Sequence, residues 1–454
     1  MKKSVIAMIS IIMILIPVMA FASSGGKDTQ AQNWNDPTLR VLNYTDLTAA
    51  NAVGDQGWLW GTFQENNPGI TILKEDLFNE PYHDKYKAYA ASGNMPDVLF
   101  VWPTARSAAL HDNKLLKDLT PLINRDGLRS QYSAAALDPA SHYAGVVNMI
   151  PAGVTASHAF YINTEVLNAC GLQPAKTYDE LKAQVPILKA RGYETIIMAN
   201  KDSWVMQSCL FSMIVGRFCG ADWNERILSG RAKFTDPDFI AALNFVKDLY
   251  DSGVIDRSSV GVGYGDGPGM FATNKGAYYV DGDWRAGAFI TDQSTGQALI
   301  SPARQRNIQV SVFPDIAGAK LNKSTSVALG TGFGMSSAIP AGSPREAAAW
   351  TLLKWLSGKE WISLQFERGG VPVPSRTDVN MAGMTLEPLQ IATANIGSQY
   401  TTATAVIDGV LDPSICQVLD DGCQELGLGN GRTPQQIAQD TQAAFDRWRR
   451  ANPR

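Results

Sequence analysis

Short runs of β-branched and aromatic residues alternate with amphipathic helical segments along the first part of the chain, and this alternation limits the possible folds more than any other feature. Residues 39–45, 70–76 and 97–102 have the composition of strands. Residues 58–64 and 82–93 have helical periodicity, and a turn signal that contains glycine follows each of them. Strands that are joined by helices in this way pair in parallel, with helices on both faces. The pattern predicts an α/β fold.

A second series of the same kind begins after residue 147. Residues 158–163 and 194–199 are predicted strands, and residues 177–192 between them form a predicted helix. A further helix is strongly signalled at 343–358, with a serine cap before it and a glycine at its end. A chain of 454 residues exceeds what one core usually holds. We therefore expect two lobes, each a mainly parallel sheet flanked by helices.

The N-terminus has the pattern of a secretory signal. Lys2 and Lys3 precede an apolar run over residues 5–19, and the Ala-Phe-Ala sequence at 20–22 offers the small residues that signal peptidase requires. Residues 1–22 are therefore a predicted signal peptide. The mature protein is expected in the periplasm or an equivalent extracellular space, without a lipid anchor, because no cysteine lies near the cleavage site.

An uncleaved membrane anchor is the alternative, since the apolar run is almost long enough to span a bilayer. Pro17 and the small residues at the end of the run favour cleavage. Residues 23–34 are polar and predicted to be a flexible leader. The formal net charge of −4 becomes more negative once Lys2 and Lys3 are removed, so nucleic acid is not an expected partner.

Five cysteines enter a compartment in which disulfides can form. Cys416 and Cys423 are the favoured pair, because the segment between them is rich in Asp and Gly and is predicted to be a loop. Cys209 and Cys219 either pair or are buried, and Cys170 is predicted to be a packed free thiol. No cysteine or histidine spacing matches a zinc site, so neither a metal nor a cofactor is expected.

From about residue 39 to residue 376 the order of segments resembles the extracellular solute-binding family that includes the maltose-binding protein and many sugar receptors of ABC importers. Each matching segment is weak by itself, and the likeness rests on their order along most of the chain. The segments are GNMPDVLFVW, IPAGVTASHAFYIN, GLQPAKTYDELKAQVPILKARG, FATNKGAYYVDGDW and FERGGVPVPSR. Two parts depart from the family pattern: an insertion at residues 265–269 and the chain after Arg376, which has no clear match.

The resemblance implies a Venus-flytrap form, in which the chain crosses between two lobes about three times and a ligand binds in the cleft. It places residues 35–146 and 315–357 in the N-terminal lobe, and residues 147–314 and 358–454 in the C-terminal lobe. It further implies a monomeric, non-enzymatic receptor that captures a mono- or oligosaccharide and delivers it to the permease subunits of an ABC transporter.

A sugar receptor needs aromatic plates for the C–H face of the ring and polar side chains for the rim of hydroxyls. The chain has 11 tryptophans, several of them beside acids or glycines in predicted loops. The resemblance places a sugar-stacking aromatic at Trp284, and Asp46 follows the first strand at the edge where open α/β sheets bind ligands. The candidate ligand-binding residues are Trp284, Asp283, Trp204, Trp102, Asp46, Thr155, Ser157, Asp202, Asp281, Gly332, Arg368 and Trp223.

For each residue a structural role is the alternative: core packing for the tryptophans, a helix cap for Asp46 and a surface ion pair for Arg368. Two other functions also remain open. A secreted glycoside hydrolase would use Asp281 and Asp283 as its paired carboxylates, but residues two apart on a strand point the same way and do not flank a bond. The same fold could instead hold a polyamine, an oxyanion or a metal.

Overall fold

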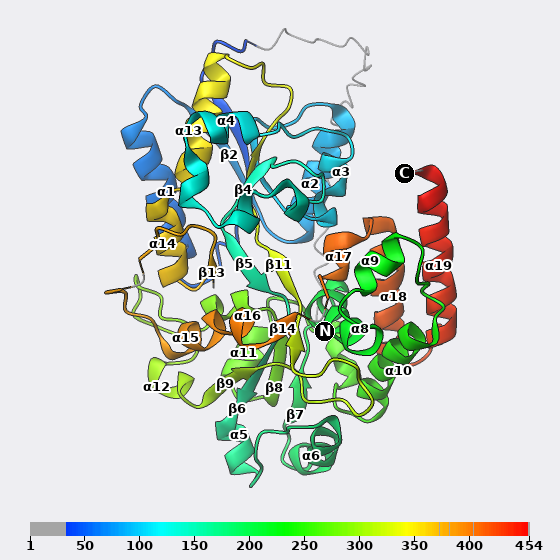
Figure 1. The fold of residues 1–454 in the computed structure, drawn as a ribbon. Helices are drawn as coiled ribbons and strands as arrows, with labels where there is room; N and C mark the ends of the chain where they lie inside the picture. The colour runs from blue at the N-terminus through cyan, green and yellow to red at the C-terminus, as the bar shows by residue number, and fades with distance from the viewer. Residues whose placement is uncertain (1–32, 372, 381, 403, 453–454) are drawn as a thin grey trace, which may run out of the picture.

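The computed structural model describes residues 33–452 except 372, 381 and 403, and it has two lobes, one above the other in Figure 1. The predicted signal peptide at 1–22 and most of the leader at 23–34 lie outside the described residues. Trp34 is described, and it is not part of a free leader: it packs on the core of the N-terminal lobe, with the guanidinium of Arg345 5.8 Å from its ring centroid.

The N-terminal lobe is built around a five-stranded sheet with the strand order β2-β1-β3-β12-β4. β1 pairs in parallel with β2 and β3, as the sequence predicts, whereas β12 is antiparallel to both of its neighbours. The strands are β1 (Leu39–Tyr44), β2 (Ile72–Leu77), β3 (Val98–Val101), β4 (Met149–Pro151) and β12 (Gly332–Met335). The longer helices of this lobe are α1 (Ala52–Asn66), α2 (Glu80–Ser92), α13 (Pro344–Leu356) and α14 (Lys359–Glu367).

Local signals fix the ends of these helices. The predicted cap of α13 is confirmed, because Ser343 Oγ accepts a hydrogen bond of 3.1 Å from the backbone N–H of Glu346. The missing N–H of Pro344 costs nothing in the first turn. Trp350 and Trp361 are buried in the core of this lobe.

The C-terminal lobe is built around a four-stranded sheet with the order β7-β8-β6-β9. Only β7 and β8 pair in parallel, and β6 is antiparallel to both β8 and β9, so the mainly parallel sheet predicted here is wrong. The reason is that β8, which comes later in the chain, inserts between β7 and β6, so consecutive strands are not neighbours. The strands are β6 (Ala159–Asn163), β7 (Glu194–Ile197), β8 (Gly276–Asp281) and β9 (Ile308–Ser311).

Helices cover this second sheet and build most of the larger core. They are α5 (Thr164–Ala169), α6 (Tyr178–Ala190), α7 (Trp204–Met206), α8 (Ser212–Cys219), α9 (Trp223–Leu228), α10 (Pro237–Asp251), α11 (Gly267–Ala272), α12 (Pro302–Gln305), α15 (Pro388–Ala394) and α16 (Ile396–Gln399). A π-helical turn, Gln207–Phe211, joins α7 to α8. None of the helices in the described part of the chain is long and apolar enough to cross a membrane.

A three-stranded sheet with the order β11-β5-β13 lies between the lobes (Figure 1). Its strands are β5 (Gly153–Ala156), β11 (Val327–Leu329) and β13 (Val373–Pro374), and each lies on a segment where the chain passes from one lobe to the other. A small parallel pair, β10 (Ser324–Thr325) and β14 (Thr401–Thr402), lies beside them. The chain thus crosses between the lobes at three segments, the number that the resemblance to the solute-binding family implies.

The residue boundaries of the two lobes stay a prediction. Two elements lie on the other side of the boundaries that we expect from the sequence. β4 follows residue 147 but pairs in the N-terminal sheet, and α14 follows residue 358 but contributes Trp361 and Ile362 to the N-terminal core.

The chain after β14 forms three helices that pack on the C-terminal lobe: α17 (Ile407–Val410), α18 (Pro413–Leu428) and α19 (Pro434–Ala451). The predicted disulfide between Cys416 and Cys423 is wrong, because both lie on α18 and not in a loop. Seven residues of α-helix separate two Cα atoms by roughly 10 Å, well beyond the reach of a disulfide. All five cysteines are buried free thiols.

We therefore expect reduction to leave the stability of the protein unchanged. Thermal unfolding with and without a reducing agent should give the same Tm, because no cross-link constrains the unfolded chain. Alkylation under denaturing, non-reducing conditions, followed by mass spectrometry, should label all five cysteines. A fall in Tm on reduction, or a pair of cysteines protected from alkylation, would contradict this arrangement.

Candidate functional site

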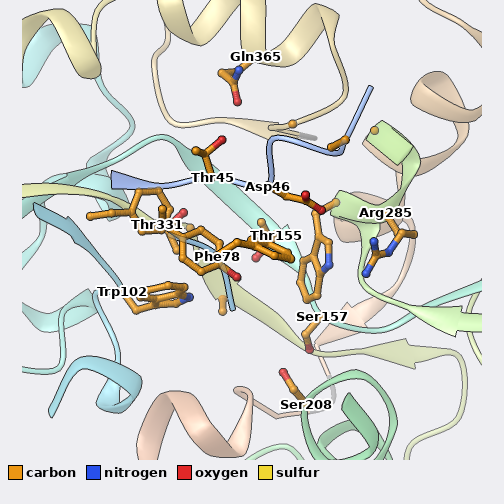
Figure 2. A pocket seen from close by; sticks show the side chains of 18 of the residues that line it. Thr45, Asp46, Phe78, Trp102, Thr155, Ser157, Ser208, Arg285, Thr331 and Gln365 are labelled. Carbon is orange, nitrogen blue, oxygen red and sulfur yellow. The ribbon is translucent and has the colours of Figure 1, made fainter. Parts of the chain in front are cut away.

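A cavity of about 440 Å³ lies between the two lobes, in the range of small-molecule sites. Its walls come from the loops after β1, β2 and β3, from the linker strands β5 and β11, and from the C-terminal lobe around residues 204–208 and 284–288. Figure 2 shows side chains from both lobes converging on this space, including Thr45 and Phe78 from one side and Ser208 from the other. The cavity thus depends on both lobes for its shape.

The N-terminal wall is a cluster of aromatic rings. Tyr44 stacks on Phe100 with centroids 5.2 Å apart and meets Trp102 edge to face at 5.1 Å. Phe78 lies 5.2 Å from Tyr44. These residues stand at or just beyond the carboxyl ends of neighbouring parallel strands, which is where open α/β sheets place their ligands. Parallel pairing of the strands therefore brings four aromatic side chains to one edge.

The C-terminal wall is centred on Trp284. A Cβ atom at Gly282 would lie 2.3 Å from the Trp284 ring, so the indole rests directly against bare backbone. The Trp284 Nε1–H donates a 2.8 Å hydrogen bond to the hydroxyl of Tyr264, and Trp204 meets Tyr264 edge to face at 4.7 Å. The ring position is fixed by these contacts within the protein.

A buried charge network supports this wall from behind. Arg285 Nε donates a 2.7 Å bond to Asp281 Oδ2, and the guanidinium carbon lies 4.0 Å from the centroid of the Tyr264 ring. Tyr279 donates a 2.6 Å hydrogen bond to the same carboxylate oxygen. A charge that is both paired and hydrogen-bonded can be held away from water, so the network can keep Tyr264 rigid under Trp284.

The two remaining arginines of the cavity are also paired with carboxylates. Arg106 Nη1 lies 3.3 Å from Asp408 Oδ2, and Arg368 Nε lies 3.6 Å from Asp55 Oδ1. Burial raises the pKa of the Asp55 carboxyl above its usual value, and Arg368 opposes that rise. Each arginine of the cavity therefore has a carboxylate partner, whereas the Asp46 carboxylate, which also lines the cavity, bonds to Thr48 and to no cation among the described residues.

Several of the predicted site residues share this cavity. Asp46 is not the cap of α1, since its Oδ1 accepts bonds of 2.9 and 2.6 Å from the N–H and hydroxyl of Thr48 and so orders the turn before Asn51. Arg368 is not a surface ion pair, because it pairs with Asp55 in the cavity wall. The predicted residues that line the cavity are Trp284, Trp204, Trp102, Asp46, Thr155, Ser157 and Arg368.

Asp281 and Asp283 do not line the cavity. They are 1 % and 2 % exposed, Asp281 within the network behind Trp284 and Asp283 as the acceptor of a 2.7 Å bond from the Ala156 N–H. Asp202 faces a neighbouring cavity, where it accepts bonds from Asn79 Nδ2 and the Tyr264 N–H. Its role is to connect the two lobes.

Gly332 and Trp223 also lie away from the cavity. Gly332 is on β12 between two paired strands, where a Cβ would lie 2.0 Å from the carbonyl oxygen of Ile150. Glycine is therefore needed here so that β12 can pair closely with β4. Trp223 is 1 % exposed and stacks on Phe239 at 5.3 Å in the C-terminal core. The core role left open for this tryptophan is the one found.

Sequence reasoning missed other lining residues. Tyr44 and Phe78 end the first two strands, so the topology of the sheet was a usable signal for them. Arg106 and Asp408 form a pair across 302 positions of sequence, and no local pattern announces such a contact. In the described part of the chain no three His, Cys, Asp or Glu side chains gather as a metal site requires.

The match to a family model decides what kind of protein carries this cavity. Residues 58–388 match the model of the bacterial extracellular solute-binding proteins. The chain belongs to this family. It is therefore a solute-binding protein of the kind that serves ABC transport, a binding protein and not an enzyme. A comparison with curated proteins found no significant match.

Solved structures of other binding proteins have the same fold. One, from a study of xylan utilisation by Caldanaerobius polysaccharolyticus, has a TM-score of 0.79 at 23 % identity, over 89 % of this chain and 99 % of its own. A chitin oligosaccharide binding protein gives 0.78 at 23 % identity, over 90 % and 98 %. The maltose/maltodextrin-binding domain MalE from Bdellovibrio bacteriovorus, bound to maltotriose, gives 0.69 at 17 % identity, over 91 % and 100 %. At these identities the likeness establishes the fold of the solute-binding protein.

The buried carboxyl of Asp283 gives the solute-binding protein a pH-dependent stability. Burial raises the pKa of Asp283 from 3.8 to about 8 in the folded chain. Between these two values the folded chain keeps the proton that the unfolded chain has lost. The contribution of Asp283 to the free energy of unfolding is therefore full below about pH 4 and decreases as the pH rises to about 8.

We expect Asp283→Asn to lose less stability than the wild type between about pH 5 and pH 8, since Asn cannot ionise. Its amide oxygen can still accept the Ala156 N–H. Urea unfolding at several pH values measures the effect, and Asp179→Asn on the exposed surface of α6 is the control, which should have the wild-type pH dependence. Equal pH dependence in Asp283→Asn and the wild type would show that the buried carboxyl does not hold the proton.

Proposed function

We propose that this solute-binding protein captures a carbohydrate in the cavity between its lobes and delivers it to the permease subunits of an ABC transporter. The observation that carries the proposal is the pair of facing aromatic walls, with Trp102 and Tyr44 on one lobe and Trp284 on the other. Flat rings of this kind suit the C–H faces of a pyranose, and the hydroxyl and carboxylate groups at the rim suit its hydroxyls. The names of the xylan-, chitin- and maltotriose-related neighbours point the same way.

The charges of the cavity support a neutral sugar over a polyamine. A polyamine site needs unpaired carboxylates around its aromatic plates, and Asp281 and Asp283 are buried behind the wall. Three carboxylates line the cavity, and two of them, Asp55 and Asp408, are each paired with an arginine. Asp46 alone has no cationic partner among the described residues, and one such group is fewer than a polyamine site needs. The same burial removes Asp281 and Asp283 as a hydrolytic pair, because a glycosidic bond could not lie between them.

Isothermal titration calorimetry against a panel of mono- and oligosaccharides, with a polyamine such as spermidine as a second arm, tests the proposal. We expect saturable binding of at least one sugar and none of spermidine. Loss of all sugar binding with the fold intact by circular dichroism, or binding of spermidine alone, would reject the proposal.

Trp284 gives the sharpest single test within the cavity. If its face stacks on a sugar ring, Trp284→Ala should weaken binding by about 1–3 kcal/mol, or roughly 5- to 150-fold in Kd. Trp284→Phe should lose less, because it keeps a flat ring and loses only the bond to Tyr264. Calorimetry measures both variants with the sugar that the wild type binds.

Trp448→Ala is the matched control, since Trp448 lies on α19 at the outer edge of the C-terminal lobe and not in the cavity (Figure 1). It should bind the sugar as the wild type does. Unchanged affinity in Trp284→Ala would remove this residue from the site.

A further inference from the structure

A second cavity, of about 350 Å³, adjoins the first. One side of it is α2 of the N-terminal lobe, and the other is formed by α17, by the first turns of α18 and by residues 201–204. The two cavities share Arg106, Trp204 and Asp408 as a common wall. The two cavities are therefore adjacent and meet at these three side chains.

The acids that line this second cavity differ in whether a donor or a cation of the protein satisfies them. Glu80 and Asp408 lie 3.8 and 3.3 Å from Arg106, and Asp202 accepts two hydrogen bonds. Asp420 is 8 % exposed and lines the cavity, but its buried Oδ1 has no hydrogen-bond partner in the described part of the chain. An unsatisfied buried oxygen costs free energy, so its presence beside a cavity calls for a donor that the protein itself does not supply.

The shared wall has an unsatisfied group of its own. Trp204 Nε1 is buried and has no partner within the described residues, although its ring packs against Tyr264 and under the guanidinium of Arg106 at 5.2 Å. An indole N–H can only donate. The cavity and its wall thus present one unused acceptor and one unused donor, which is the combination that a hydroxyl group can satisfy.

Two of the residues concerned lie beyond the part of the chain that matches the family model. That match ends at residue 388, whereas Asp408 and Asp420 lie on α17 and α18 beyond it. α18 begins with Asp412 as its cap, whose Oδ1 accepts a 2.9 Å bond from the Ser414 N–H, and this start sets the face of the helix that carries Asp420. The C-terminal segment of this chain therefore supplies one side of the second cavity, and the family-matched part supplies the rest.

We propose that the second cavity receives a further glycosyl unit of the ligand held in the central cavity, with a hydroxyl of that unit bound to Asp420. The inference rests on the proposed function and narrows it, since the ligand must then be an oligosaccharide of at least two units. Burial raises the pKa of the Asp420 carboxyl well above its usual value, which favours the protonated form, and a protonated carboxyl can both donate to and accept from a hydroxyl.

The test compares sugars of increasing length by calorimetry: xylose, N-acetylglucosamine and glucose, each with its β-1,4- or α-1,4-linked dimer and trimer. In the series that binds, the wild type should bind the dimer more tightly than the monomer. Asp420→Leu should weaken dimer binding by about tenfold, as expected for one lost buried hydrogen bond, and leave monomer binding unchanged. Asp420→Asn, which keeps an acceptor but not the neutral acid, should lie between the two.

Asp421→Leu is the control, because Asp421 is the next residue of α18 and faces solvent; it should match the wild type at every length. Asp420→Leu should fold with an unchanged or higher Tm, since it removes an oxygen that has no partner. Should Asp420→Leu not fold, Asp420→Asn provides the same comparison.

Equal loss for monomer and dimer, or no loss for either, would overturn the inference while leaving the proposed function in place. Equal affinity of the wild type for monomer and dimer would overturn it as well. Binding of no sugar by the wild type would overturn the inference together with the proposed function.

Discussion

The position of the Trp284 ring against the bare backbone of Gly282 is the constraint on which the rest of the cavity depends. No side chain other than hydrogen fits between them, because a Cβ at Gly282 would lie 2.3 Å from the indole. Gly282 itself has φ −80, which any residue can adopt, so the need for glycine is one of space and not of backbone conformation. The Tyr264 hydroxyl then fixes the rotation of the indole through its 2.8 Å bond.

A ring that is already immobilised loses little side-chain entropy when a ligand binds, so more of the stacking energy appears as affinity. The buried pair Arg285 and Asp281 helps to immobilise Trp284 indirectly, through Tyr264. It holds Tyr264 from behind, with the guanidinium 4.0 Å from the ring centroid, and Asp202 accepts the Tyr264 N–H at 2.8 Å. The acids that the sequence suggests as ligand contacts thus act by holding an aromatic wall in place.

Hydrogen bonds join the lobes at several places beside the cavity, one of which is the pair Arg106 and Asp408. Asn51, held at φ 62, donates from its backbone N–H to Asp292 Oδ2 and from its side chain to the Thr291 carbonyl, and its Oδ1 accepts from the Gln293 N–H. Asn79 donates to Asp202 across the other side. The linker strands β5, β11 and β13 connect the lobes, so a movement of one lobe against the other would pivot there and would break these contacts.

The features that the sequence predicts well are those set by local chemistry: the strands and helices of the N-terminal lobe, the Ser343 cap, and Trp102 just after β3. The prediction for the segment from Cys416 to Cys423 is wrong although local signals were present. The segment from Cys416 to Cys423 was expected to be a loop because of its Asp and Gly content, although the Asp-Pro start before it and the left-handed Gly429 after it are helix signals. The signals at the two ends of this segment outweigh its composition, and they specify a helix.

The residues of the cavity also divide into those that a sequence rule can predict and those that only the folded chain brings together. Tyr44 and Asp46 reach it because parallel strands end at a common edge, a rule that operates on one sequence alone. Arg106 and Asp408 meet only because α17 folds back against the loop after β3, 302 positions earlier in the chain. Contacts of the first kind follow from the two-lobed architecture. The contact between Arg106 and Asp408 depends on the segment after residue 388. We therefore expect α17 and α18 to determine which ligands this cleft accepts.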